Sequence, residues 1–187
     1  ALTNDMYTEQ LELNYRWVQE KFDLMVGARA IAQQTHSRTY YGNTLARDTL
    51  YNKWNFSPNM NFRYKFDRKK FARIIYRGST QNPSITQMEP VRNNSDALNE
   101  TVGNLGLQPA YRHNIFMMYS SFNQEKFSSM MVGMNANLTQ DALTNNTIYD
   151  KTGKRYMQTV NSEMIPWYVG AHFMSNTPFC NKMFQFH

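Results

Sequence analysis

The chain has 187 residues, a net charge of +6 and a mean hydropathy of −0.67. Its single cysteine excludes an internal disulfide framework, and the absence of any run of about 18 apolar residues excludes a transmembrane helix. A low mean hydropathy still allows a membrane β-barrel, because only alternate residues of each strand would face lipid. The opening residues lack the pattern of a signal peptide, so we expect a mature chain or a piece of a longer one.

The first predicted elements are two alternating strands. Apolar and polar residues alternate over residues 11–17, and every second residue is apolar over residues 22–32. A period of two is typical of β-strands whose two faces meet different surroundings. The short charged segment 19–21 between them predicts a hairpin turn. The segment that follows, residues 34–50, is polar and predicts a long loop.

The next element, residues 54–66, reads WNFSPNMNFRYKF and keeps strict alternation for thirteen residues, well beyond the usual ~5–6 of soluble strands. At ~3.4 Å per residue and a tilt of about 45°, it would cover roughly 31 Å, close to the ~30 Å hydrocarbon core of a membrane. Pro58 cannot donate a ladder hydrogen bond and predicts a bulge. The predicted lipid-facing residues are Trp54, Phe56, Met60, Phe62, Tyr64 and Phe66.

The rest of the chain repeats this plan. Further strands are predicted over residues 71–79, 111–122, 127–138 and 165–173. Charged turns are predicted at residues 67–70, 123–126 and 180–182, and long polar loops at residues 79–109 and 140–161. The loops would hold the candidate ligand contacts, whose side chains can stack on or hydrogen-bond a sugar or peptide: Tyr40, Tyr41, Asn93, Asn94, Asn145 and Asn146.

Short turns alternating with long loops, and aromatic residues beside each short turn, are the plan of an outer-membrane barrel. The sequence therefore predicts an all-β fold: an antiparallel up-and-down transmembrane β-barrel segment of about 7–8 strands over residues 1–187. A soluble β-sandwich with core aromatics is the alternative, although it explains neither the strand length nor the two classes of connection.

A family resemblance lies in the middle of the chain. FSPNMNFRYKF resembles a barrel strand of TonB-dependent outer-membrane receptors, and the residues after the next turn resemble the strand that follows it there. The family's Gly-Asn-Pro-x-Leu-x-Pro-Glu segment is matched by Gly103, Asn104, Leu107 and Pro109. Leu105 replaces its usual proline and Ala110 its usual glutamate.

The resemblance continues at Ile148, Asp150 and Gly153, which are similar to an Ile-x-Asp-x-x-Gly loop of the same receptors. It implies a sector of a barrel of about 22 strands. It also implies an outer-membrane location, lipid contact and uptake of a scarce or bulky solute. The implied partners are the rest of the barrel, a plug domain, a TonB-type inner-membrane energy-transducing complex and a surface lipoprotein. No plug and no TonB box are recognised in these residues.

The residues that carry chemistry elsewhere are absent or scattered. The four histidines show no metal-ligand spacing, and no hydrolase, metalloprotease or phosphate-loop motif is present. We therefore expect no enzyme activity, no cofactor and no metal site. The basic residues Arg63, Lys65, Arg73 and Arg77, with the turn at residues 67–70, raise the possibility of nucleic-acid binding, but charges facing a barrel lumen explain them better, so we expect no nucleic-acid partner.

The leading hypothesis is a sector of an outer-membrane receptor for energy-coupled uptake, with the long loops at the ligand mouth. The alternatives are a small closed outer-membrane barrel acting as an adhesin or structural anchor, and a soluble β-sandwich binding module.

Overall fold

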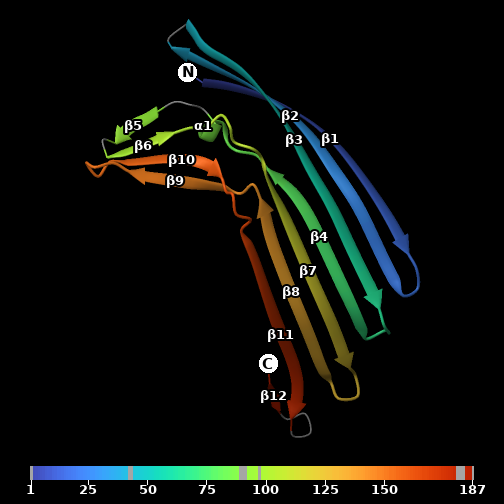
Figure 1. Cartoon of the computed structure of the whole chain (residues 1–187). Coiled ribbons are helices and arrows are strands. Elements are labelled where there is room, and N and C mark those ends of the chain that lie inside the picture. The colour runs from blue at the N-terminus through green and yellow to red at the C-terminus, as the bar shows by residue number, and fades with distance from the viewer. Residues whose placement is uncertain (1, 42–43, 89–91, 97, 180–183, 187) are drawn as a thin grey trace. The chain divides into compact units, whose positions relative to one another are not determined.

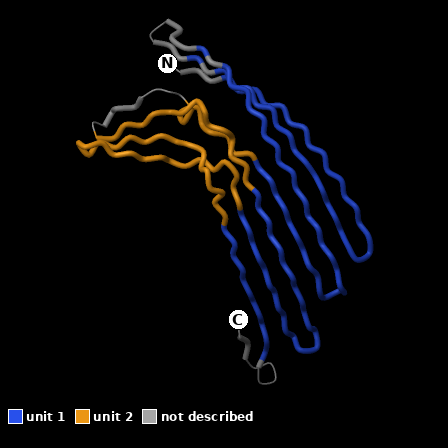
Figure 2. Tube along the Cα trace, in the orientation of Figure 1, with its two compact units in different colours: residues 1–79, 113–137, 168–187 blue, residues 80–112, 138–167 orange. Residues whose placement is uncertain are grey.

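The computed structural model describes residues 2–41, 44–88, 92–96, 98–179 and 184–186. The chain divides into two compact units (Figure 2). Unit 1 comprises residues 1–79, 113–137 and 168–187, and unit 2 comprises residues 80–112 and 138–167. No described helix is long or apolar enough to cross a membrane.

Unit 1 is built on an eight-stranded sheet, as the alternation predicts (Figure 1). Its strands follow chain order, apart from the segments that enter unit 2, so the antiparallel up-and-down topology is confirmed for this sheet. Among the described residues the sheet is open, with β1 and β12 at its edges. In order, its strands are β1 (Leu2–Val18), β2 (Phe22–Tyr41), β3 (Thr44–Lys65), β4 (Lys70–Gln81), β7 (Ala110–Asn123), β8 (Ser128–Gln140), β11 (Trp167–Phe179) and β12 (Phe184–Phe186).

The predicted tight turns at residues 19–21, 67–70 and 123–126 are confirmed, within a residue at each end, and lie at one end of the sheet (Figure 1). The N–H of Gln19 donates to the carbonyl of Phe22 at 2.8 Å, which closes the first turn. The side chain of Asn123 accepts the N–H groups of Glu125 and Lys126 at 3.0 and 3.1 Å, which holds the third. The turn predicted at residues 180–182 lies outside the described residues.

The loop predicted at residues 34–50 is wrong, because β2 and β3 continue through most of it. Successive side chains here are polar, and some of them pair across the strands. Gln34 donates to Asn52 at 3.2 Å, Arg38 pairs with Asp5 at 3.0 Å, and a ring nitrogen of His36 lies 2.5 Å from Asp48. Such pairs stabilise a sheet without apolar burial, so polarity alone does not indicate a loop.

The bulge predicted at Pro58 is also wrong, since Pro58 stays in register with Ala28. Ladder hydrogen bonds alternate sides along an antiparallel strand. The N–H of Lys65 donates to the carbonyl of Lys21, directly before β2, and the N–H of Phe66 donates to the carbonyl of Lys70 in β4. Even-numbered positions of β3 therefore point their nitrogens toward β4. The recorded β3–β4 pairs end at Asn59, so the N–H that proline lacks is not needed there.

Cross-strand register defines two faces of the unit 1 sheet. Residues directly opposite one another share a face. Phe62 lies opposite Leu24 and Ile74, whereas Asn61 lies opposite Met25 and Ile75. We call the face of Phe62 the apolar face and the face of Asn61 the polar face. The apolar face of β1–β3 includes Leu11, Leu13, Tyr15, Trp17, Phe22, Leu24, Val26, Trp54, Phe56, Met60, Phe62 and Tyr64.

Burial shows that unit 1 has no ordinary core among its described residues. Apart from glycine and proline, the buried apolar residues of the described chain are Leu107 and Ala110, and both belong to unit 2. Val26 is 44% exposed and Trp54 72% exposed, and much of the rest of the apolar face is open as well. A contiguous apolar face of this extent requires lipid or a partner rather than water.

Unit 2 contains the residues predicted as the two later loops, and that prediction is wrong in part. They form a second sheet in the order β5 (Arg92–Asp96), β6 (Asn99–Val102), β10 (Arg155–Asn161) and β9 (Leu143–Tyr149), with the short helix α1 (Ile85–Met88). The β6–β10 pair is parallel, unlike every pair expected from the sequence. The strands are short and polar, so their alternation is hidden in a composition typical of loops.

Candidate functional site

The apolar face of unit 1 carries a band bounded by aromatic residues. Near the turns, Trp17 meets Phe22 with ring centroids 5.0 Å apart, and Phe66 lies 5.0 Å from Tyr64 and 6.0 Å from Tyr119. Trp54, ten residues before Tyr64 in β3, marks the other limit of the band. Beyond it, the same face becomes polar at Asn52. Ten residues at ~3.3 Å and a tilt of about 45° give a band roughly 23 Å tall, close to the ≈25 Å apolar band of outer-membrane barrels.

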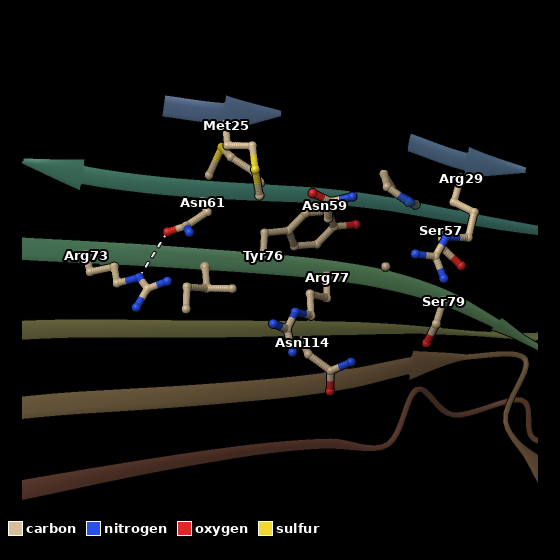
Figure 3. Close-up of a pocket in the computed structure, with 14 residues that line it drawn as sticks. Met25, Arg29, Ser57, Asn59, Asn61, Arg73, Tyr76, Arg77, Ser79 and Asn114 are labelled. Carbon is tan, nitrogen blue, oxygen red and sulfur yellow. Dashed lines mark hydrogen bonds between the residues drawn. The ribbon is translucent and has the colours of Figure 1, made fainter. Parts of the chain in front are cut away.

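The polar face holds a depression of about 500 Å³ (Figure 3). Its lining residues come from β2, β3, β4 and β7. The β2–β3 and β3–β4 registers bring the residues of the first three strands together. Arg73 donates to the side-chain oxygen of Asn61 at 3.0 Å, the contact drawn in Figure 3. Its polar-face lining includes Met25, Arg29, Ser57, Asn59, Asn61, Arg73, Ile75, Arg77, Ser79 and Asn114.

The charge of this face is strongly positive. Over the described residues of β1–β4 it carries seven basic side chains against Glu12 and Asp23, a difference of +5. Each of the two carboxylates is already paired with an arginine, since Arg29 lies 2.8 Å from Glu12 and Arg16 lies 2.5 Å from Asp23. The seven basic residues are Arg16, Arg29, Lys53, Arg63, Lys65, Arg73 and Arg77.

Chemically, the depression is suited to acidic groups. Guanidinium groups bind carboxylates and phosphates in a bidentate manner, and the amides of Asn59, Asn61 and Asn114 add neutral donors and acceptors. Arg63 also stacks over the ring of Phe71, with its guanidinium carbon 4.3 Å from the centroid, which keeps that charge on the same face. Gly27 lies opposite Asn14 and Asn59 on this face, and a Cβ there would collide with the side chain of Asn14.

The Gly103–Pro109 motif acts as a structural clip inside unit 2. The side chain of Asn104 donates to the carbonyl of Thr159 at 3.2 Å, and the side chain of Gln158 donates to the carbonyl of Gly103 at 3.3 Å. The side chain of Asn161, in β10, accepts the N–H of Gln108 at 2.8 Å and donates to the Gln108 carbonyl at 2.9 Å. Leu107 lies beside this clip and is only 7% exposed. The motif residues therefore hold β10 to the segment between β6 and β7.

The Asp150–Gly153 segment forms the turn between β9 and β10. Asp150 accepts the hydroxyl of Thr152 at 2.6 Å and the N–H groups of Thr152 and Lys154 at 2.8 and 3.0 Å. The hydrogen bond from the Thr152 side chain contributes most to lowering the pKa of the Asp150 carboxyl. Gly153 has φ = 83°, in the left-handed region that glycine adopts without a steric penalty.

A partly buried ion pair supports the same unit. Lys154 lies 2.7 Å from Glu100, which is only 5% exposed, and its ammonium lies 5.2 Å from the centroid of the Tyr156 ring. The hydrogen bond to Glu100 is the main cause that raises the pKa of Lys154. The pair joins β6 to the end of the β9–β10 turn, so its role is structural.

The predicted ligand contacts are not gathered into one described cluster. Tyr40 and Tyr41 end β2 and Asn93 and Asn94 lie in β5, and these four side chains lie outside the description. Asn145 and Asn146 are exposed on β9, where Asn145 accepts the hydroxyl of Thr159 at 3.1 Å. All six therefore remain predictions as contacts.

Sequence reasoning missed part of the polar face. The positions of Arg73 and Arg77 on the same face as Arg63 and Lys65 were predicted and are confirmed by the β3–β4 register. Arg29, Asn59 and Asn114 were missed as members of the depression. The signal was available for Arg29, because it alternates with the apolar residues of β2 and so shares the parity of Met25. Within the described residues, no group of three or more possible metal ligands comes together.

Comparisons with known proteins agree with this geometry. The model of the outer membrane protein beta-barrel family matches residues 7–184, so the chain belongs to that family and to the outer membrane. The crystal structure of the siderophore receptor PirA from Pseudomonas aeruginosa is similar in fold, with a TM-score of 0.52 and 14% identity. The match covers 94% of this chain and 40% of that receptor. The comparison with curated proteins found no match.

Proposed function

We propose that this outer-membrane β-barrel protein forms one sector of a larger receptor barrel, which takes up a scarce or bulky solute by energy-coupled transport. The observation that carries the proposal is the open eight-stranded sheet of unit 1, whose apolar face is exposed along a membrane-sized band. Unpaired edges such as β1 associate or aggregate unless further strands cover them. In a wider barrel, lipid would cover the apolar face and further strands would pair with the edges of this sheet.

The similarity to a longer receptor supports the same conclusion. This chain spans 40% of the length of that siderophore receptor, which leaves room there for further strands and another domain. By analogy, the remainder of the barrel, a plug, a TonB-type complex and a surface lipoprotein are the proposed partners. A metal-chelate solute such as a ferric siderophore is the first candidate to test. The net positive polar face favours either an acidic solute or acidic groups of a plug.

The proposed orientation places the short turns in the periplasm and segments 79–109 and 140–161 outside the cell. A cysteine at Lys69, in the second turn, should be unreactive toward a membrane-impermeant maleimide in intact cells. A cysteine at Lys151 should react. Both side chains are exposed, so accessibility in the folded chain does not distinguish them. The opposite labelling pattern would refute the orientation.

The sector proposal is tested by folding residues 1–187 alone in detergent or phospholipid vesicles. A closed barrel of this chain should run as a compact, heat-modifiable species relative to its 22.1 kDa mass. A sector should give no such species until the rest of the barrel is supplied. A heat-modifiable monomer would instead favour the small-barrel adhesin or anchor. A monodisperse, detergent-free monomer would favour the soluble sandwich.

Energy coupling is tested separately in cells that carry the complete gene. Uptake of a radiolabelled ferric siderophore should fall to background when a protonophore collapses the proton gradient. Uptake that survives this treatment would refute energy coupling but not the sector.

A further inference from the structure

The outer limit of the apolar face contains a notch whose chemistry differs from the limit near the turns. It has a volume of about 350 Å³, and the lining residues on the apolar face are Tyr7, Glu9, Ala32, Gln34, Asn52 and Trp54. Register places them in two adjoining rows. In one row Ala32 lies opposite both Glu9 and Trp54, and in the other Gln34 lies opposite both Tyr7 and Asn52. The notch therefore lies where the apolar band ends.

The two aromatic limits are built differently. Near the turns, the rings pack on one another, as in the 5.0 Å contact of Trp17 with Phe22. In the notch, Tyr7 and Trp54 stand on β1 and β3 with β2 between them, and they are 67% and 72% exposed. Between and beside them lie two amides and one carboxylate. Two open aromatic faces around hydrogen-bonding groups are suited to an amphipathic ligand with apolar CH faces and hydroxyl groups.

Charge disfavours a phosphate as the main ligand. Lys53 also lines the notch, but by register it belongs to the polar face of β3. On the apolar face of β1–β3, the described cation beyond the band is Arg38, which is paired with Asp5 at 3.0 Å, while His36 contacts Asp48. Glu9 adds a negative charge to the notch. An uncharged, hydroxyl-rich group fits this arrangement, because amides and a carboxylate supply both donors and acceptors to hydroxyls.

We propose that this notch binds the uncharged saccharide headgroup of a membrane glycolipid at the outer limit of the apolar band. The rings of Tyr7 and Trp54 contact the CH faces of the sugar, and Gln34, Asn52 and Glu9 hydrogen-bond its hydroxyls. The 3.2 Å hydrogen bond between Gln34 and Asn52 holds the two amides in place before a ligand arrives. The proposal requires the apolar face to contact lipid, but it does not require solute uptake.

The test uses the protein that contains this chain, reconstituted in phosphatidylcholine vesicles. One variant keeps Trp54 as the reporter within this chain (Trp17→Phe, Trp167→Phe), and its matched control keeps Trp17 (Trp54→Phe, Trp167→Phe). Digalactosyl diacylglycerol, an uncharged glycolipid, should change the Trp54 emission saturably and leave that of Trp17 unchanged. Adding Tyr7→Leu or Gln34→Ala to the Trp54 reporter should raise the half-saturating glycolipid fraction at least tenfold.

Four results would overturn the proposal. They are an equal response of both reporters, no response of Trp54, an equal response to phosphatidylglycerol, and an equal response to free digalactose at the same concentration. Quenching of the two tryptophan reporters by brominated acyl chains distinguishes failure of the notch proposal from failure of the lipid-facing placement. If they quench both reporters while the glycolipid has no effect, the notch proposal alone fails. If they quench neither, the lipid-facing placement fails with it.

Discussion

Val26 provides a sharp test of the membrane-facing sheet, because its side chain is 44% exposed and an arginine there would meet little steric resistance. It lies opposite Met60 on β3 and Tyr15 on β1, on the apolar face. Along β3, Met60 is four residues from Tyr64 and six from Trp54. At ~3.3 Å per residue and a tilt of about 45°, Val26 lies roughly 9 and 14 Å from the two limits of the band.

That depth is close to the midplane of the proposed bilayer, so Val26→Arg should lower the free energy of unfolding by about 2–4 kcal/mol. In water, the same substitution at so exposed a strand position should cost within about 0.5 kcal/mol. The matched control is Met25→Arg, one residue away and on the polar face opposite Asn61. Its added charge stays hydrated, and repulsion from nearby arginines should cost no more than about 1 kcal/mol.

The measurement is equilibrium unfolding by urea of the complete barrel protein in phospholipid vesicles, followed by tryptophan emission. Both variants and the parent are compared at the same lipid-to-protein ratio. The result is the difference in the free energy of unfolding between the two variants, whose substitutions are at adjacent residues. Equal losses for Val26→Arg and Met25→Arg would refute the assignment of the two faces. A negligible loss for Val26→Arg would refute lipid contact at this face.

Three further predictions concern unit 2. Asn161→Ala removes the side-chain hydrogen bonds to Gln108 and Asp141 and should cost about 1–3 kcal/mol, seen as faster proteolysis between β6 and β7. Gly153→Ala places a side chain at φ = 83° and should cost about 1–2 kcal/mol, measured as earlier thermal loss of β9–β10. Because the pKa of Asp150 is lowered in the folded turn, its stabilisation is complete above the ordinary aspartate range and is lost as pH falls through the lowered value. Amide exchange at Gly153 and Lys154 should therefore quicken in acid, after correction for intrinsic rates, and Asp150→Asn should flatten that response.

The strands of unit 1 could be predicted from the sequence because the two faces of its sheet have opposite chemistry on alternate residues. Met60 and Asn61 are adjacent and belong to opposite faces, as their alternation requires. The same rule failed at residues 34–50, where both faces are polar. There the pairing of His36 with Asp48 replaces apolar burial, and hydropathy carries no period to detect.

The candidate sites were harder to predict, because each one is assembled across strands. Arg29 and Arg77 come together on the polar face only through the β2–β3 and β3–β4 registers. The parallel β6–β10 pair joins segments more than fifty residues apart, and short polar strands give no signal of such a partner. The Gly103–Pro109 segment was singled out by a resemblance alone, and its place in a hydrogen-bonded clip is revealed only by the contacts of Asn104 and Asn161.

The extension of β2 and β3 beyond the apolar band connects these findings. A strand that only crossed the membrane would end near Trp54, yet β3 begins ten residues earlier, at Thr44. The added residues carry paired charges on the same face that carries apolar residues below, so this face changes solvent without a change of secondary structure. In the proposed membrane placement, lipid contact would end and water contact begin within the two rows that form the notch. The proposed ligand site at this level combines aromatic and amide groups, which suit that boundary.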